Sequence, residues 1–399
     1  MILVSAAPAA PARLASGSVT QRVVRALSSF VVCLVLVAVQ LATTVRADLV
    51  ITSGATPAIR LDPPVRSFSL IATGDVLTES PVLIAAATNA GYDFGPLFAP
   101  VAPMLSSVDI AICHMEIPIG APGDLPGVYG RSPFGGNLIL APHEIAGALR
   151  AAGFDRCSTA SNHSNDLGEP GIGTTLAALD EAGISHAGTA RSPAEAATGL
   201  ITVNGVHLAH LAYTRYSNTV LPVEPWRVNF AATPAQVAAD VNAARAAGAE
   251  VVVVSLHLSQ ELLPAPFPED RQFVTDLTSL AHIDLVVEHG PHVIQPLEQV
   301  NGTWVYWSVG NFTSGMGTSS RGKYADPRTL DEIAAGARFT ETAPGTFGVE
   351  PWPVLLCDDP FTRVVYAPLT GFPQPVAPAT QSAMTQCIQR SIPVVPTLH

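Results

Sequence analysis

The stretch from residue 281 to residue 296, AHIDLVVEHGPHVIQP, constrains the fold more than any other part of the chain. A short apolar run follows an expected helix at 268–280 and ends at His289 and His292, which are separated by Gly-Pro. Such a run is typical of a buried strand, and polar residues after a buried strand of an α/β sheet lie at its carboxyl edge. Two imidazoles in one loop at that edge indicate a metal site, with solvated loop histidines as an equally common alternative.

Four more strand-like runs end in residues that can bind a metal. They end at Asp75, at Glu116, at Asn162 with His163, and at His257. Each residue taken singly also has a structural explanation. Asp75 is explained as a turn residue, Glu116 as a surface carboxylate, Asn162 as a loop amide and His257 as a satisfied core histidine. Their shared place at strand ends predicts that they converge. Carboxylate, amide and neutral imidazole groups suit a pair of divalent ions that share one carboxylate.

Strand-like and helical segments alternate along the chain, with hairpin turns expected at Asn204-Gly205 and at Asn301-Gly302. This pattern predicts an α/β fold, with a mixed sheet or a pair of sheets flanked by helices. Residues 120–136 are rich in Gly and Pro and are expected to form a long surface loop over the strand ends. We expect the main domain to span 67–312, and 313–399 to be an extension that packs on this core.

Residues 1–47 have the pattern of a signal peptide. Arg22 and Arg25 precede an apolar run at 30–39, and Val45 and Ala47 occupy the −3 and −1 places of a cleavage site. The run of roughly ten apolar residues is short against the ~20 that a spanning helix needs. We therefore expect export to the periplasm, the cell envelope or the medium, with an uncleaved anchor as the alternative, and a linker at 48–66.

The acidic charge of the chain bears on its partners. The formal net charge is −12, and the first 47 residues hold four of the 20 basic residues and no acid, which leaves 16 − 32 = −16 after cleavage. Such a surface argues against nucleic acid and anionic membranes as partners, although an acidic excess also serves solubility.

Four cysteines follow the expected signal peptide. Cys357 and Cys387 could pair in an oxidising compartment and attach the C-terminal segment. Cys113 and Cys157 lie in apolar runs and are expected to be buried small residues instead.

Several of these motifs together resemble the CapA-type capsule-synthesis family. They are Gly74-Asp75, His114-Met-Glu116, the ASNHSND run at 160–166, Ser255-Leu-His257 and the HGPHVIQP run at 289–296. The similarity covers roughly 68–312, with the motifs in the family's order. It implies a role in making poly-γ-glutamate. It also implies a metallophosphoesterase-like α/β/β/α sandwich of two mixed β-sheets flanked by helices.

The resemblance also implies roles for the motif residues. Two divalent ions (Mn, Fe, Zn or Mg) would be held by Asp75, Glu116, Asn162, His257, His289 and His292. The first ion would take Asp75 and His292, the second Asn162, His257 and His289, and Glu116 would bridge them. His163 would be the general acid, and Asp166 would orient it.

Three residues depart from the family pattern. Leu77 stands where the phosphoesterases usually have the histidine of an Asp-x-His motif, so the first ion would have one ligand fewer. His114 replaces an asparagine; a surface substitution is the default interpretation, with an added ligand or a proton carrier as alternatives. Glu288 replaces a glycine and is expected to put a negative charge beside His289.

Two functional hypotheses follow. The first is an exported dimetal hydrolase that acts on a phosphoester or on a bond of a cell-envelope polymer. The second is a non-catalytic accessory subunit that holds a nascent anionic polymer or a membrane synthase. A structural exported domain without activity is a third alternative.

Overall fold

The computed structural model describes residues 47–49, 59–61, 65–197, 200–258, 260–318, 323–372 and 375–398. The chain divides into two units, 1–64 and 65–399. In the first unit, β1 (Ala47–Leu49) pairs antiparallel with β2 (Ile59–Leu61), and both strands lie at or within the expected linker. Residues 1–46 of the expected signal peptide lie outside the described residues. Among the residues described, no helix has the length and apolar character needed to cross a membrane.

The second unit contains a nine-stranded mixed sheet. Its strands are β3 (Ser67–Val76), β6 (Ile110–Met115), β9 (Arg156–Ser158), β10 (Ser185–Ala187), β17 (Asn311–Thr313), β18 (Asp331–Ala343), β19 (Thr346–Pro351), β20 (Val354–Asp358) and β21 (Val365–Tyr366). Strands β3, β6, β9 and β10 run parallel to one another, and β18 pairs antiparallel with β3. Residues after Phe312 therefore supply a strand next to β3, inside the sheet rather than outside it.

A six-stranded mixed sheet lies in the same unit, in the order β11-β12-β13-β14-β16-β15. Its strands are β11 (Leu200–Val203), β12 (Val206–Thr214), β13 (Val251–His257), β14 (Leu285–His289), β15 (Leu297–Val300) and β16 (Thr303–Tyr306). Both predicted hairpins are confirmed. Asn204 and Gly205 have φ of 48° and 76°, and Asn301 and Gly302 have φ of 50° and 86°, the left-handed values that two-residue hairpin turns require.

Helices and small hairpins complete the unit. The helices are α2 (Ser80–Ala86), α3 (Gly95–Phe98), α4 (Ala102–Leu105), α5 (Glu144–Ala152), α6 (Gly168–Ala182), α7 (Pro193–Ala196), α8 (Pro234–Ala246), α9 (Pro268–Leu280) and α10 (Pro378–Ser391), with 3₁₀ turns at Lys323–Ala325 and Pro327–Leu330. β4 (Ala87–Thr88) pairs with β5 (Gly91–Tyr92), and β7 (Gly127–Arg131) pairs with β8 (Asn137–Leu140). The expected surface loop at 120–136 thus contains the first strand of a hairpin.

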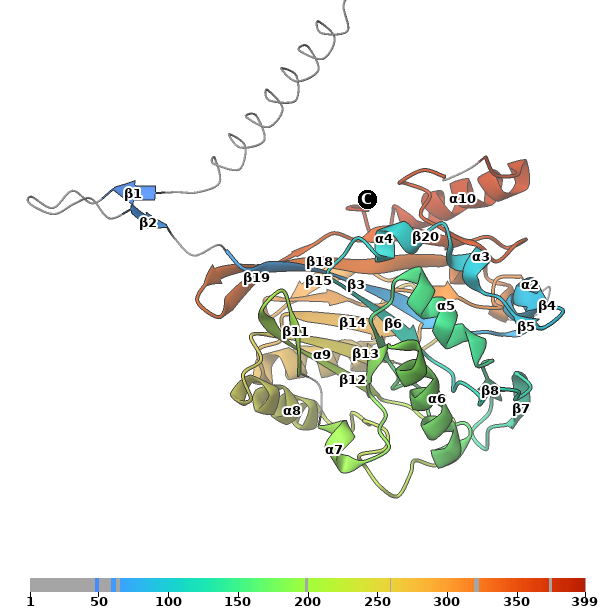
Figure 1. Ribbon diagram of the computed structural model, residues 1–399, viewed down its shortest axis with the longest axis horizontal. Helices are drawn as coiled ribbons and strands as arrows, with labels where there is room; N and C mark the ends of the chain where they lie inside the picture. Colours follow the sequence, from blue (N-terminus) through green and yellow to red (C-terminus); the bar gives the residue numbers. More distant parts are fainter. Residues whose placement is uncertain are drawn as a thin grey trace, which may run out of the picture. The chain divides into compact units, whose positions relative to one another are not determined.

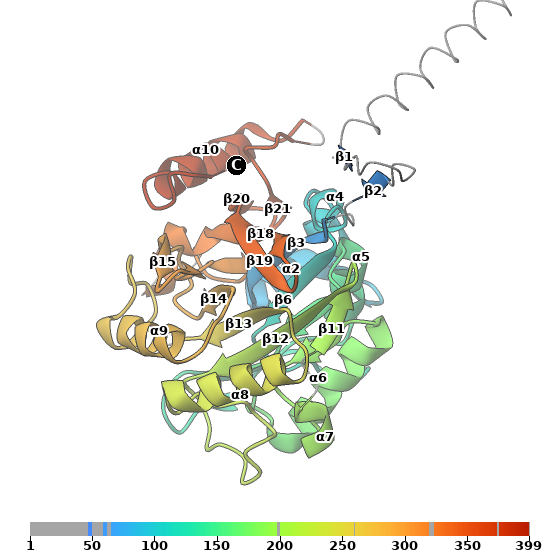
Figure 2. The same ribbon diagram turned by 90° about the vertical axis from the view of Figure 1, so that its left-hand side faces the viewer.

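The two sheets pack face to face, with helices on both outer sides. Along β13, Val251 and Val253 join Leu70 and Ile112 in a core between the sheets, whereas Val252 and Val254 pack against α8 and α9. The outer face of the nine-stranded sheet packs on α5 and α6 (Figures 1 and 2). Since side chains alternate along a strand, the two faces of a fully apolar strand pack in two different hydrophobic cores. The predicted sandwich of two mixed sheets flanked by helices is confirmed.

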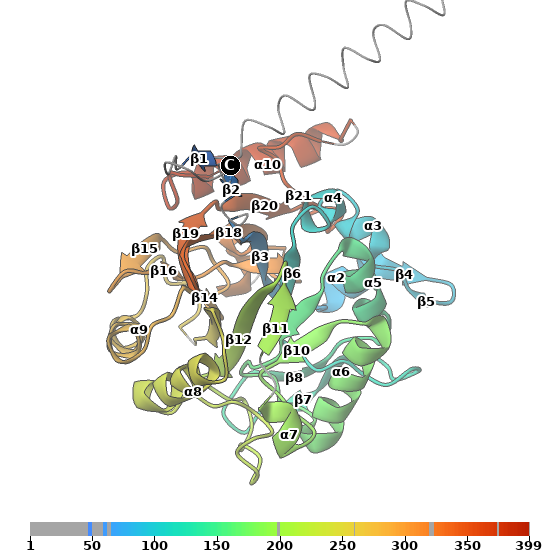
Figure 3. The ribbon, with the colours of Figure 1, turned by 60° about the vertical axis from the view of Figure 1, so that its left-hand side comes forward.

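The parallel strands bring the predicted site residues to one edge of both sheets. Asp75 pairs with His114 in the register of β3 and β6, and His257 pairs with His289 in the register of β13 and β14. Strand β3 lies beside β6 (Figure 3), and β14 of the other sheet contacts β3. The carboxyl ends of parallel strands in two stacked sheets therefore form one common site.

The four cysteines of the second unit form two disulfides. Cys357 on β20 is bonded to Cys387 on α10, with their Cα atoms 6.3 Å apart, so the C-terminal helix is tied to the sheet as expected. Cys113 and Cys157 are buried, as expected, but they are also bonded to each other, a pairing that the sequence did not predict. They are direct partners in the parallel register of β6 and β9, a relationship that their apolar surroundings do not reveal.

Candidate metal centre

Asp75 lies at the middle of the site, at the end of β3, and its side chain is fully buried. Its Oδ2 lies 3.0 Å from Nδ1 of His292 and accepts a hydrogen bond from Gly290 N at 3.2 Å. Its Oδ1 lies 3.4 Å from Nδ1 of His289. A Cβ at Gly74 would collide with the carbonyl oxygen of Gly310, so the chain passes this point only with glycine before Asp75.

Glu116 follows β6 and is likewise buried, with Oε1 4.0 Å from Nε2 of His292. Asp75, Glu116 and His292 each offer one ligand atom, and these atoms lie within 4.8 Å of one another. His292 has a φ of 59°, a left-handed conformation that is uncommon outside glycine. Its Nδ1 also lies 2.9 Å from Asn311 Oδ1, which helps to hold the ring in this position.

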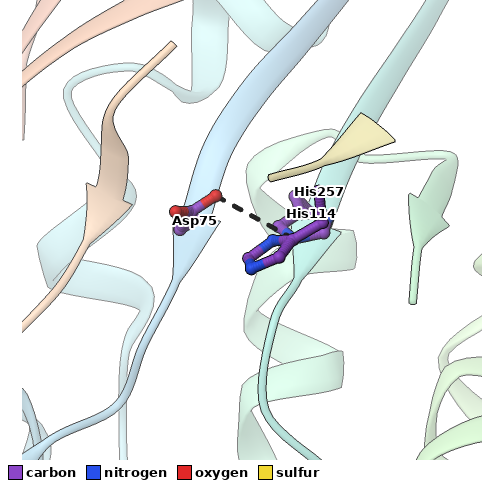
Figure 4. A group of neighbouring side chains, drawn as sticks. All are labelled: Asp75, His114 and His257. Atoms are coloured by element: carbon purple, nitrogen blue, oxygen red, sulfur yellow. Dashed lines mark hydrogen bonds and ion pairs between the residues drawn. The ribbon is translucent and has the colours of Figure 1, made fainter. Parts of the chain in front are cut away.

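His114 belongs to the site, which corrects the default interpretation as a surface substitution. Only 1% of His114 is exposed, and its Nε2 lies 3.0 Å from Nδ1 of His257. Its ring stacks on that of His289 with the centroids 4.0 Å apart. Figure 4 shows His114 beside His257 and directed toward Asp75. Since residues 114 and 116 share one face of an extended segment, the alternation of side chains could have indicated this placement from the sequence.

His163 and Asp166 form a hydrogen-bonded pair at the rim. His163 Nδ1 lies 2.6 Å from Asp166 Oδ2. Asn218, which sequence reasoning missed, places its Nδ2 3.2 Å and 3.3 Å from the two ring nitrogens of His163. Its Oδ1 accepts a hydrogen bond from Asn162 Nδ2 at 3.3 Å. Asn218 lies in the loop after β12, where no local sequence pattern indicates a role in the site.

A cavity of about 90 Å³ opens beside these groups. Its lining includes Glu116, Asn162, His163, Asn218 and His292. The structure thus brings together Asp75, Glu116, Asn162, His163, Asp166, His257, His289 and His292, the whole set singled out from the sequence. Their arrangement leaves a space beside His163 that Glu79 and Glu261 also line.

The polar atoms of the site fit the divalent ions that the fold family implies. Buried atoms without a hydrogen-bond partner include Asp75 Oδ1, Glu116 Oε2, Asn162 Oδ1 and both ring nitrogens of His289. A buried polar atom left unpaired costs about 1–3 kcal/mol, more when charged, and a coordinated cation removes that cost. Oxygen and imidazole donors of this kind suit Mn, Fe, Zn or Mg.

The pKa shifts of Asp75 and Glu116 also fit a site for a divalent cation. Burial acts to raise the pKa of Asp75, but the imidazoles of His289 and His292 outweigh it and hold that pKa well below its usual range. Burial and then the charge of Asp75 raise the pKa of Glu116 well above its usual range. Burial and the charge of Asp75 thus disfavour ionisation of Glu116, and a bound cation would favour ionisation of both groups.

Glu288 does not place a charge beside His289, contrary to expectation. Because adjacent side chains of β14 point to opposite faces, Glu288 is directed away from the site and is fully buried. Burial, followed by the charge of Asp270 on α9, raises the pKa of Glu288 well above its usual range. Burial thus disfavours the charged form of this carboxyl group, whose charged neighbours are Asp270, Arg271 and Arg215 rather than His289.

Fold and site together define a layered α/β protein with a buried cluster of carboxylate and imidazole groups suited to divalent metal ions. The family model described as "Bacterial capsule synthesis protein PGA_cap" matches residues 69–316, more than half of the chain. The chain belongs to this bacterial capsule synthesis family, which confirms the resemblance found in the sequence motifs.

Three relatives illustrate the family. "PGA biosynthesis protein CapA" of Bacillus subtilis is 30% identical over 220 residues, covering 52% of this chain and 53% of that protein. "Capsule biosynthesis protein CapA" of Bacillus anthracis is 26% identical over 184 residues, covering 45% and 44%. A "Probable polyglutamine synthesis accessory protein" of Mycobacterium tuberculosis is 28% identical over 220 residues, covering 52% and 56%. The chain thus spans about half the length of the curated relatives it matches.

Two solved structures are also similar. The calcineurin-like phosphoesterase YfkN from Bacillus subtilis aligns with a TM-score of 0.44 at 13% identity, covering 83% of this chain and 99% of that one. A 5'-nucleotidase precursor from Thermus thermophilus aligns with a TM-score of 0.40 at 11% identity, covering 82% and 59%.

Proposed function

We propose that this protein is a dimetal-dependent hydrolase that acts on a phosphoester or on a bond of a cell-envelope polymer during synthesis of a poly-γ-glutamate-type capsule. The observation that carries the proposal is the set of unpaired buried donors on Asp75, Glu116, Asn162 and His289, next to the cavity that His163 lines. Buried polar groups without partners destabilise a fold, so a cluster of this composition indicates a functional site.

The residues divide into binding and proton-transfer groups. Two divalent ions held by the carboxylate and imidazole groups would polarise the scissile group and lower the pKa of an attacking water. His163, at the cavity wall, donates a proton to the leaving-group oxygen. Asp166 holds the His163 ring through Nδ1 and so leaves Nε2 for that transfer.

Metal binding tests the proposal directly. The full chain would be incubated with Mn, Zn or Fe, its metal content measured, and its activity assayed on aryl phosphates and on poly-γ-glutamate. We expect two ions per chain and metal-dependent hydrolysis. Glu116→Gln is expected to lose bound metal, whereas the control Glu144→Gln, on an exposed position of α5, is expected to keep it. A folded wild-type chain that binds none of these ions would overturn the proposal.

A second function, that of a non-catalytic accessory subunit, is supported by two observations. A relative is named as an accessory protein of polyglutamine synthesis, and the apolar Leu77 lines the cavity where a further ligand could stand. Such a subunit would hold a nascent anionic polymer or a membrane synthase. His163→Ala distinguishes the two functions in a deletion strain. The enzyme variant fails to restore capsule formation, whereas an accessory subunit restores it fully.

We further propose export to the cell envelope or the medium. The basic residues, apolar run and small residues of 1–47 support it, as does the presence of two disulfides, which persist in oxidising compartments. N-terminal sequencing of the protein from the envelope and medium fractions tests this. A mature start near Asp48 is expected, and an intact chain confined to the cytoplasmic fraction would contradict it.

A further inference from the structure

We propose that His114 is itself a metal ligand and shares one ion with Asp75 and His257, so that His257 joins the ion of Asp75 instead of the second ion that the resemblance implies. The inference rests on the proposed metal centre and adds one ligand to it. His114 takes the place of the histidine that an Asp-x-His motif would put at position 77, where this chain has Leu77. Asp75, His114 and His257 are all fully or almost fully buried, and each presents one ligand atom within 4.8 Å of the others (Figure 4).

The two imidazole nitrogens stand at the separation of two ligands of one ion, and the Asp75 oxygen lies slightly farther away. His114 Nε2 lies 3.0 Å from His257 Nδ1 and 3.9 Å from Asp75 Oδ1. Imidazole nitrogens bind Zn at ~2.0–2.1 Å, so two ligands of one ion typically lie about 3–3.5 Å apart. Asp75 Oδ1 has no hydrogen-bond partner among the described residues, which leaves this oxygen available to a cation.

Ser158 fixes the orientation of the His114 ring. Ser158 Oγ lies 2.7 Å from His114 Nδ1 and is placed to donate its proton to the carbonyl oxygen of Cys113 at 3.4 Å. With its proton directed there, the hydroxyl oxygen accepts from Nδ1–H of His114. The lone pair of His114 is then on Nε2, which points at Asp75 and His257. A hydrogen bond of this kind to the far nitrogen is usual for a metal-binding histidine.

Leu77 explains why a ligand on β6 is needed. Leu77 follows β3 and lines the cavity of the site, and its side chain is apolar and 2% exposed. It offers no donor to an ion bound by Asp75 two residues earlier. His114 on the neighbouring strand is the direct register partner of Asp75, so it can supply a nitrogen from the adjacent position.

Binding of Co²⁺ to the full chain tests the proposal, because its visible spectrum reports the ligands and its affinity is measured without any substrate. We expect His114→Asn to weaken Co²⁺ binding by at least tenfold and to change the absorption bands. The double variant Leu77→His with His114→Asn is expected to recover affinity, since it returns an imidazole to the cavity from β3. His210→Asn, a buried histidine of β12, is the control and is expected to leave the spectrum unchanged.

The outcomes separate this inference from the proposed function. If the wild type binds Co²⁺ and folded His114→Asn binds it with the same affinity and spectrum, His114 only orients His257 and the inference fails alone. If the wild type binds no Co²⁺, the inference fails, and the proposed function fails with it only if Mn, Zn and Fe are not bound either. Should the variants not fold, anomalous diffraction from wild-type crystals at the cobalt edge decides the matter. An ion within ~2.1 Å of His114 Nε2 is expected, and one out of bonding distance of Nε2 would overturn the inference.

Discussion

His163 Nδ1 and Asp166 Oδ2 are 2.6 Å apart, and the same carboxylate oxygen accepts a hydrogen bond from Ile139 N at 2.8 Å. The backbone of β8 thus holds Asp166, and Asp166 holds the ring of His163. Asn218 contacts the same ring from the loop after β12. A general acid fixed from two sides is oriented before substrate binds, which is the condition for efficient proton transfer.

Substitution of this pair is expected to reduce turnover without loss of metal. His163→Ala should lower kcat by roughly 10²–10⁴-fold, because the leaving group then departs without a proton. Asp166→Asn should lower it by roughly 10–100-fold, since the ring loses its orienting carboxylate. Steady-state kinetics with metal analysis checks both, with Asp180→Asn on α6 as the surface control. Unchanged kcat in both variants would exclude the general-acid role.

Asn218 is expected to act through Asn162 and His163 together. Its Oδ1 accepts from Asn162 Nδ2, which turns the Asn162 oxygen toward the site. Asn218→Ala should therefore weaken metal binding and lower kcat by roughly tenfold each, whereas Asn218→Asp, which keeps the acceptor, should preserve more of the metal affinity.

The matched control for Asn218 is Asn165→Ala. Asn165 Nδ2 donates to Thr219 Oγ1 and Val220 O, so it anchors the same loop without a hydrogen bond to His163. Titration of the metal and kinetics on all three variants are compared. Equal losses in Asn218→Ala and Asn165→Ala would show that only the position of the loop matters.

His210 is expected to make the fold sensitive to acid. It is fully buried between the sheets, where Arg156 Nε donates to its Nδ1 at 2.9 Å and Ser255 Oγ lies 3.0 Å from its Nε2. Burial, then the charges of Arg156 and His289, lower the pKa of His210 well below 6.5. The unfolded chain therefore takes up this proton first as the pH falls. The contribution of His210 to stability is complete above pH ~6.5 and is lost below it, by up to ~1.4 kcal/mol per pH unit.

Urea denaturation at pH 7, 6 and 5 measures this effect. His210→Gln should reduce the loss of stability between pH 6.5 and 5 relative to the wild type. His207→Gln, at an exposed position of the same strand, should leave it unchanged. The other buried histidines are the same in all three proteins, so the difference isolates one proton. Parallel curves for His210→Gln and the wild type would contradict the prediction.

The disulfide between Cys357 and Cys387 is expected to stabilise the attachment of α10. It closes a loop with a sequence separation of 30, which corresponds to about 3–4 kcal/mol in the chain-entropy account. Replacing both cysteines with alanine should lower the free energy of unfolding by roughly that amount. The ion pair of Arg390 with Asp331, at 2.7 and 2.5 Å, should keep the helix in place. Urea midpoints of the variant and the wild type are compared, and equal midpoints would show that the bond adds nothing.

Strand ends and turn residues were readable from the sequence because they depend on local chemistry. The apolar run that ends at His257 and the Asn-Gly pairs of the two hairpins act within a few residues, so their effect does not require knowledge of distant partners. The opposite faces of Glu288 and His289 also follow from strand alternation, so the expectation of a negative charge beside His289 was wrong.

The sequence by itself determined the layered α/β architecture and the residue types that can bind a metal. Only the tertiary structure decided which of them meet. The register of β3 with β6 places His114 opposite Asp75, and that of β6 with β9 places Cys113 opposite Cys157. The loop after β12 brings Asn218 to His163 across 55 residues of chain. These contacts arise from the packing of whole strands and loops, and that packing minimises exposed apolar area over the entire chain rather than within any one segment.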